Sequence, residues 1–388
     1  MGKSSKKRSG RNRRRGRGAP SAGGGGGDVP PPSASDPASP PSDPVIRRVR
    51  HGDPRVRHAA LIALSGTVYG PSLSSSSSAS EGGAAGGRAS DPSLLRAVSE
   101  RLLDSDVPTA IAAAGCLANY AASGAGAGEV SDGGAGGEMD VAGEVTAPIL
   151  LQRVTRSLSS LEEMTASHRD QIAEDAAIPK SQSNETAGNR AKTAFERSWP
   201  KTHEQWTLLS LSLLTLAGLV ENFPRVLERT GTAALPGLLA VLPLAGATGG
   251  LVRAAKESAG DGGDGSIDAG PADDAASHAS RALHSLLDEN PRLVSSMPVS
   301  VPDAAGGNRA PSLSSASAGL GSAASDPGAG DACRLHASGA LLALRRFAVL
   351  DSEASGAALS REEKRLADEI QRTTDDAVLP LVASVVSE

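Results

Sequence analysis

Aromatic residues are scarce in this chain of 388 residues, where Phe, Trp and Tyr together make up only 2%. Sheet cores are usually rich in aromatic and β-branched side chains, so this scarcity speaks against a β-sandwich or a conventional α/β domain. The apolar side chains that are present are Ala, Leu and Val in clusters, which suit closely packed helices. The low aromatic content therefore favours an all-α protein.

Cysteine is almost absent as well. Cys116 and Cys333 are far apart, and neither belongs to a CxxC or Cys/His pattern, which excludes the usual zinc and disulfide signatures. We expect both to be reduced, buried residues of an intracellular protein. The HExxH, GxSxG and P-loop motifs are missing, and carboxylate pairs such as Glu162 and Glu163 are typical of a solvated face. We therefore expect a protein that is not an enzyme and takes no cofactor or metal.

Long apolar runs are also lacking. The most apolar run, 208–220, is too short to cross a bilayer and contains Ser and Thr. The N-terminus has no apolar segment of the kind found in secretory signals. We expect a soluble protein.

Charge is distributed unevenly along the chain, although its formal net value is only -5. Without the basic residues of the N-terminal arm, 30 basic residues face 44 acidic ones, a balance of -14. The sequence thus predicts a basic arm on an acidic body, and such a body attracts basic partners and repels nucleic acid. The nine basic residues of the arm, among which no acid occurs, are Lys3, Lys6, Lys7, Arg8, Arg11, Arg13, Arg14, Arg15 and Arg17.

Glycine, proline and serine concentrate in low-complexity stretches. Residues 1–43 form a basic arm rich in Pro, Gly and Ser, which we expect to be disordered because it cannot build a core. The second predicted region, 44–388, is helical, and we expect disordered inserts within it near 71–91, 123–137, 245–272 and 302–330.

Short helices with one apolar face recur between these inserts. In GDPRVRHAALIALSG, residues 52–66, an Asp-Pro start precedes apolar residues at helical spacing. A helix this short cannot bury its apolar face alone, so the repetition predicts a stack of helical units. The matching positions are Asp53, Val56, Ala59 and Leu64 in the first unit, and Asp104 or Asp106, Val107, Ala110 and Leu117 in the second.

A later segment, HEQWTLLSLSLLTLAGLVENFPRVLERTG, is apolar around much of its circumference. It follows a polar connection that we place at about residues 165–200. A helix of this kind is expected to lie between neighbours on two sides. Together with the absence of strand-like alternation, this predicts an all-α solenoid of HEAT/armadillo-like repeats. The main face carries Trp206, Leu209, Leu213, Leu216 and Val220, and Leu208, Leu211 and Leu219 widen it.

The ordered series of segments is similar to one family of HEAT/armadillo-repeat proteins. DPRVRHAALIALSG resembles the HEAT consensus, and the segments that follow it include LLDSDVPTAIAAAGCLANYAA, VTAPILLQRV and ALHSLLDENPRLVSSMP. With the basic start MGKSSKKR, the series resembles the symportin family of ribosomal-protein import. The resemblance covers roughly half of the residues, between positions 43 and 300.

The resemblance implies a nuclear import adaptor and dedicated chaperone for newly made ribosomal proteins of the 5S ribonucleoprotein. Such a protein supports large-subunit ribosome biogenesis and shuttles between cytoplasm and nucleus. Its partners would be those basic ribosomal proteins and an import receptor of the importin-β class that reads the basic arm. The chain has no Pro-Tyr pair, a signal used in the family, so the kind of receptor stays open. The family also has a long acidic insert and more repeats towards the C-terminus, so we expect either a short or an incomplete version of it here.

Two residues are candidate client contacts. Asn119 can clamp an extended peptide because its amide both donates and accepts hydrogen bonds, although local capping is the alternative. Trp199 precedes Pro200 in the predicted connection and is a candidate surface anchor. Trp206, on the leucine face, is expected in the core.

Two other functions stay open. A generic HEAT-repeat scaffold would bind other proteins without a ribosomal client. An RNA-binding protein would use the Arg-rich arm, although no aromatic residue interleaves the arm for base stacking.

Overall fold

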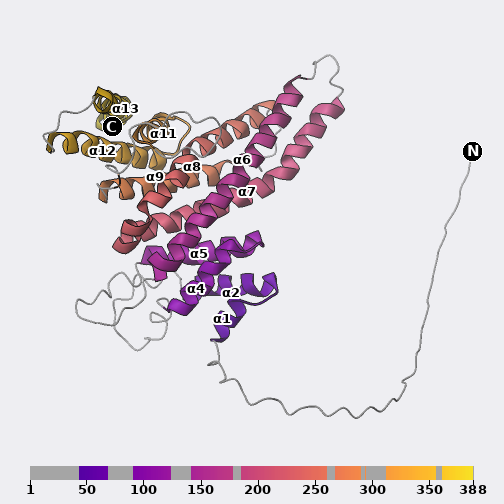
Figure 1. Cartoon of the computed structure of the whole chain (residues 1–388). Helices are drawn as coiled ribbons and strands as arrows, with labels where there is room; N and C mark the ends of the chain where they lie inside the picture. The colour runs from indigo at the N-terminus through magenta and orange to yellow at the C-terminus, as the bar shows by residue number, and fades with distance from the viewer. Residues whose placement is uncertain are drawn as a thin grey trace, which may run out of the picture. The chain divides into compact units, whose positions relative to one another are not determined.

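The computed structural model describes residues 43–68, 91–123, 141–177, 185–259, 267–289, 293, 312–354 and 361–387. Within these ranges the chain is helical and has no strand, as the sequence predicts (Figure 1). The main helices are α1 (Pro44–Val49), α2 (Pro54–Thr67), α4 (Pro92–Glu100), η2 (Arg101–Leu103), α5 (Val107–Ser123), η3 (Ala142–Thr146), α6 (Ala147–Ala177), α7 (Glu185–Asn222), α8 (Pro224–Ala259), α9 (Gly270–Glu289), α11 (Leu313–Ser325), α12 (Asp331–Ala354) and α13 (Arg361–Ser387).

Successive helices form pairs, and each pair packs on the next. One row contains the contacts α1–α4, α4–α6, α6–α8, α8–α11 and α11–α13. The other row contains α2–α5, α5–α7, α7–α9 and α9–α12. Both rows are joined within each pair, as in α6–α7 and α8–α9. The described chain is therefore an all-α helical-repeat solenoid.

Asp-Pro steps open the first helices. The carboxylates of Asp43, Asp53 and Asp91 each accept a hydrogen bond from the backbone N–H two residues later, at 2.7, 2.9 and 2.8 Å. Proline follows each of these caps, where its missing N–H leaves no intrahelical bond unmade. These helix starts were predictable because the signal lies in adjacent residues.

One buried ion pair links the first two units. Arg57 Nε lies 2.8 Å from Asp104 Oδ2, and the two side chains are only 11% and 4% exposed. The guanidinium also donates to the carbonyl oxygens of His51 and Gly52 at 2.9 and 2.7 Å. Asp104 in turn accepts from the backbone N–H of Asp106, just before α5. The pair thus fixes the turn before α2 against the turn before α5.

Replacing Arg57 tests this link. Arg57→Ala leaves the Asp104 carboxylate buried beside only Arg101, so we expect the free energy of unfolding to fall by about 3 kcal/mol. The control is Arg55→Ala, an exposed arginine of the same helix, which should change it by less than about 0.5 kcal/mol. Urea unfolding of the full chain measures both, and equal losses in the two variants would contradict this role.

Helix α7 joins two hydrophobic cores. The N-terminal core lies among α1 to α6 around fully buried residues such as Leu61, Leu102 and Leu117, and it includes Leu208 and Leu219 of α7. The C-terminal core extends from α6 to α13. The opposite face of α7 packs in this core and consists of Trp206, Leu209, Leu213, Leu216 and Val220. This confirms the prediction that the helix lies between neighbours on two sides.

Helices α5 and α7 approach closely at Gly218. A Cβ at this position would lie 3.0 Å from the Cβ of Ala121 and 3.4 Å from its carbonyl carbon. Asn222, one turn later, donates from Nδ2 to the carbonyl oxygens of Ala121 and Gly218, both at 3.0 Å. Small residues and one amide therefore hold the two helices together.

A larger residue at Gly218 should separate the helices. We expect Gly218→Leu to lower the free energy of unfolding by about 1–3 kcal/mol through overpacking. Gly115 of α5 is the control because a Cβ there meets nothing within 4 Å. Gly115→Ala should raise stability by about 0.5–1 kcal/mol through better helix propensity. A Gly218→Leu variant as stable as the parent in thermal unfolding would show that the packing is loose.

Three of the predicted irregular stretches are wrong in their bounds. The connection at 165–200 is largely helical, since α6 continues to Ala177 and α7 begins at Glu185. The predicted insert at 245–272 is shorter than expected, because α8 continues to Ala259. The predicted insert at 302–330 contains helix α11. Packing explains the last case: the Ser/Ala-rich α11 buries Leu313, Ala316, Leu320 and Ala324 in the C-terminal core. The inserts at 71–91 and 123–137 lie outside the described residues except at their ends, as does nearly all of the arm 1–43.

Candidate functional site

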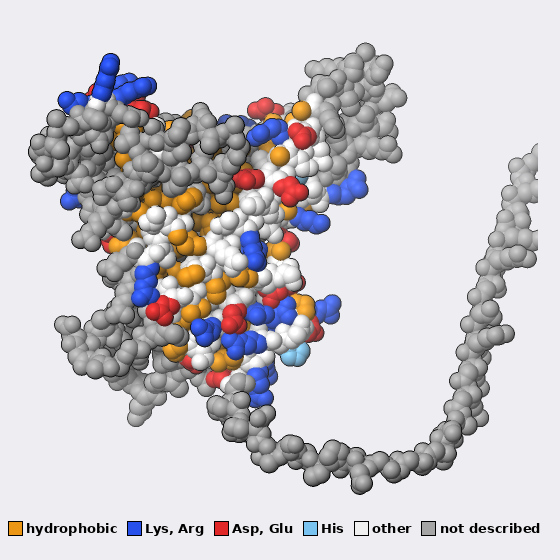
Figure 2. All heavy atoms as spheres, viewed as in Figure 1, with side chains coloured by type: hydrophobic (Ala, Val, Ile, Leu, Met, Phe, Trp, Pro, Cys, Tyr) orange, Lys and Arg blue, Asp and Glu red, His pale blue; other side chains and the backbone are white. Residues whose placement is uncertain are grey.

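Acidic and basic residues separate along the stack. Residues 43–68 carry five Arg and two Asp, and Figure 2 shows basic side chains gathered over this end. In contrast, the ranges 267–289, 312–354 and 361–387 together carry 15 acidic and 8 basic residues. The acidic excess of the described body therefore lies in its C-terminal helices.

Four aspartates come together at the start of α9, and we call them the acidic cluster. They are Asp268, Asp273 and Asp274, all exposed, and Asp326, which follows the last residue of α11 and is half-buried. Although Asp273 is exposed overall, partial desolvation of its carboxyl group, followed by the charges of Asp268, Asp274 and Asp326, raises its pKa, while Arg253 acts in the opposite direction. The cluster is thus a local excess of negative charge.

Local turns hold two of these carboxylates in place. Asp268 Oδ1 accepts from the Gly270 N–H at 3.1 Å, and Asp326 Oδ1 accepts from the Gly328 N–H at 2.8 Å. Asp274 is exposed, and its side chain holds no such turn. Chemically, the cluster can hold guanidinium and ammonium groups of a basic chain. Among the described residues, no group of three or more His, Cys, Asp or Glu is arranged to hold a metal ion.

Sequence reasoning did not find the acidic cluster. Its members come from the connection before α9, from α9 itself and from the end of α11, more than 50 residues later. Only the Asp273-Asp274 pair was visible in the sequence, where it is typical of a solvated face. The fold brings the carboxylates of Asp268 and Asp326 next to this pair.

The structure corrects the prediction made for Trp199. This residue lies inside α7, is only 4% exposed and packs with Phe195 and Val252. Its ring centroid is 5.4 Å from that of Phe195 and 6.2 Å from that of His168. The prediction of a surface anchor is wrong because the segment around Pro200 is helical and the indole closes a small aromatic cluster between α6, α7 and α8. Trp206, by contrast, is in the core as expected.

The other predicted site residues have different outcomes. Asn119 is half-buried in α5 and stays a prediction as a client contact. The nine basic residues of the arm lie outside the described residues, so their expected role in receptor binding stays a prediction. They are Lys3, Lys6, Lys7, Arg8, Arg11, Arg13, Arg14, Arg15 and Arg17.

Both cysteines are buried and unpaired, as expected. Burial raises the pKa of the Cys116 thiol to about 12, and its Sγ lies 3.2 Å from the carbonyl oxygen of Leu61. Burial also raises the pKa of Cys333. Since the thiolate is the reactive form, neither thiol is prepared for nucleophilic chemistry at neutral pH.

Among the described residues, one segment is long and apolar enough to cross a membrane. It is Arg229–Glu257, within α8, with a mean hydropathy of 1.7. A buried core helix can be equally long and apolar, and here Leu235, Leu238 and Val241 are buried in the C-terminal core. The sequence placed the most apolar run in α7 and missed this one.

Comparisons with known proteins leave the family open. No protein-family model matches the chain, and no curated protein does. Seven chains of solved structures match. One is described as an engineered protein; it is 10% identical, with 86% of this chain and 96% of the other covered and a TM-score of 0.37. A likeness at this level bears on neither fold nor function.

The acidic cluster lowers the stability of the folded protein by an amount that depends on pH. Because the folded-state pKa of Asp273 is raised, its contribution to stability is present below its ordinary pKa and lost as the pH rises through the raised value. Asp273→Asn should therefore raise Tm by about 1 °C at pH 7, with the gain shrinking as the pH falls toward 4. Thermal unfolding at both pH values measures this. A gain that is independent of pH would rule out charge repulsion as its cause.

Proposed function

We propose that this protein is a non-enzymatic solenoid adaptor that holds a newly made basic ribosomal protein of the 5S ribonucleoprotein and brings it to a nuclear import receptor. The observation that carries the proposal is the stack of helical pairs with acidic charge concentrated at one end. The resemblance of its ordered segments to the symportin family supports the choice of client.

The physical mechanism is charge neutralisation over a long surface. A ribosomal protein that has left its RNA carries unpaired Lys and Arg, which associate with other polyanions unless they are covered. A solenoid offers many shallow contacts along its helices, and its acidic end supplies carboxylates in place of phosphates. Ribosomal RNA, with its higher charge density, then displaces the adaptor.

The basic arm supplies the import address in this proposal. Its Lys and Arg can lie along an acidic groove of an importin-β-class receptor, and the protein would shuttle between cytoplasm and nucleus. Deleting residues 1–18 should abolish nuclear entry and leave client binding intact. Loss of RNA binding on the same deletion would instead favour an RNA-binding protein.

The acidic cluster gives a direct test of client binding. In Asp273→Asn/Asp274→Asn, two negative charges are removed without touching the turns held by Asp268 and Asp326, so affinity for a purified basic ribosomal protein of the 5S ribonucleoprotein should fall by about three- to tenfold. Isothermal titration calorimetry at low and physiological salt measures this, and the loss should shrink as salt rises.

A matched control removes the same charge elsewhere. Glu162→Gln/Glu163→Gln changes two exposed carboxylates of α6 and should leave affinity unchanged. If the parent chain does not bind the ribosomal protein, the proposed client is wrong and a generic scaffold is favoured. Equal losses in the two double variants would place the contact outside the acidic cluster.

A further inference from the structure

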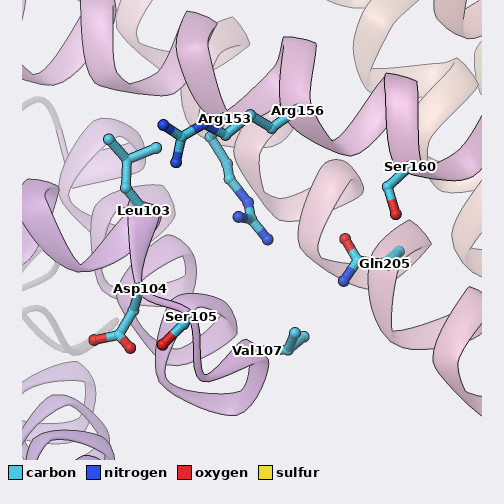
Figure 3. A pocket seen from close by; sticks show the side chains of 8 residues that line it. All are labelled: Leu103, Asp104, Ser105, Val107, Arg153, Arg156, Ser160 and Gln205. Carbon is cyan, nitrogen blue, oxygen red and sulfur yellow. The ribbon is translucent and has the colours of Figure 1, made fainter.

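A cavity of about 340 Å³ opens where α6 and α7 face the turn between η2 and α5 (Figure 3). The lining residues are Asp104 and Ser105 of the turn, Leu103 and Val107 at the adjoining ends of η2 and α5, Arg153, Arg156 and Ser160 of α6, and Gln205 of α7. This site is formed by residues distinct from those of the acidic cluster. Its polar lining combines two guanidinium groups with one carboxylate, two hydroxyls and one amide.

Arg153 is the unusual member of this lining. The residue is only 8% exposed, and its Nε is buried without a hydrogen-bond partner. Burial, followed by the positive charge of Arg156, lowers the pKa of Arg153. An arginine buried in this way costs stability unless an anion pairs with it.

The one carboxylate of the lining is already engaged. Asp104 pairs with Arg57 at 2.8 Å and with Arg101 at 3.4 Å. Figure 3 shows its carboxylate turned away from the two arginines of α6. Within the described residues, the side chains of Arg153 and Arg156 form no hydrogen bond or ion pair. The cavity is therefore lined by two positive charges, one buried (Arg153) and one exposed (Arg156), that no side chain in the described part of the chain balances.

We propose that this cavity binds a phosphate dianion, either free phosphate or a phosphate monoester, with Arg153 and Arg156 as its two guanidinium ligands. The fork of an arginine matches the paired oxygens of phosphate or carboxylate, but two arginines balance a dianion rather than a single carboxylate. The hydroxyls of Ser105 and Ser160 and the amide of Gln205 supply further donors.

The size of the cavity fits a small ligand. Its volume lies at the low end of ligand pockets, which run from about 300 to 1,000 Å³. That leaves space for the phosphate and the first atoms of the group that carries it, as in a phosphorylated serine side chain. A free phosphate and a phosphorylated side chain share this chemistry, and the experiment distinguishes them.

Binding is measured on the full chain at constant ionic strength with inorganic phosphate, O-phosphoserine and acetate as probes. We expect phosphate and O-phosphoserine to raise Tm and acetate at the same concentration not to do so. In Arg153→Gln the dissociation constant for O-phosphoserine should rise by about 10- to 100-fold, since a charge-assisted pair is lost. Arg153→Lys, which keeps the charge but loses the fork, should be intermediate.

A second readout separates ligand binding from a structural role. Without ligand, Arg153→Gln should have a Tm equal to or above that of the parent, because an unpaired buried charge is removed. Arg372→Gln, an exposed arginine of α13, is the control and should behave as the parent with every probe. Tighter binding of O-phosphoserine than of phosphate would identify a phosphorylated side chain as the ligand, and equal binding would identify phosphate alone.

Three results would overturn the proposal. The first is no response of the parent to phosphate or O-phosphoserine, and the second is the same response in Arg153→Gln as in the parent. The third is an acetate response that equals that of phosphate, which would make the cavity a carboxylate site. All three can be read without knowing the client of the solenoid.

Discussion

The constraint on which the rest of this structure depends is that no helix pair here can bury its apolar surface alone. The helices are short or rich in small residues, and aromatic residues are only 2% of the chain, so each pair needs its neighbours to complete a core. Helix α7 meets this need on two sides, because Leu208 and Leu219 enter one core while Trp206 and Leu213 enter the other. Interactions between neighbouring pairs, such as that of Arg57 with Asp104, then fix how consecutive units meet.

The same architecture separates charge. Because the main contacts of each described unit are with adjacent units, one end of the stack can be rich in arginine while the other is rich in aspartate and glutamate. The acidic end suits a basic partner, and the arginine-lined cavity between α5, α6 and α7 suits an anion. In a solenoid the two surfaces can act independently, since a stack of repeats has no single central site.

A feature of this fold could be predicted from the sequence where the residues that determine it are close together in the chain. The Asp-Pro steps at Asp53 and Asp91 mark helix starts in adjacent residues, and the leucine pattern of α7 identifies its two buried faces within one segment. Composition gave the wrong prediction where tertiary packing determines the structure. The Ser/Ala-rich segment of α11 was expected to be disordered, but it is helical because Leu313 and Leu320 pack in the C-terminal core. Trp199, Arg153 and the acidic cluster escaped prediction for the same reason: their surroundings are made by residues distant in sequence.

The most direct test of the central claim is hydrogen exchange on the full chain carrying Leu208→Ala, a change in the α7 face that completes the N-terminal core. If each unit is stabilised by its neighbours, exchange should become faster in α5 and in the start of α6, and the effect should fade toward α12 and α13. A uniform increase over all described helices, or no increase in α5, would contradict the account.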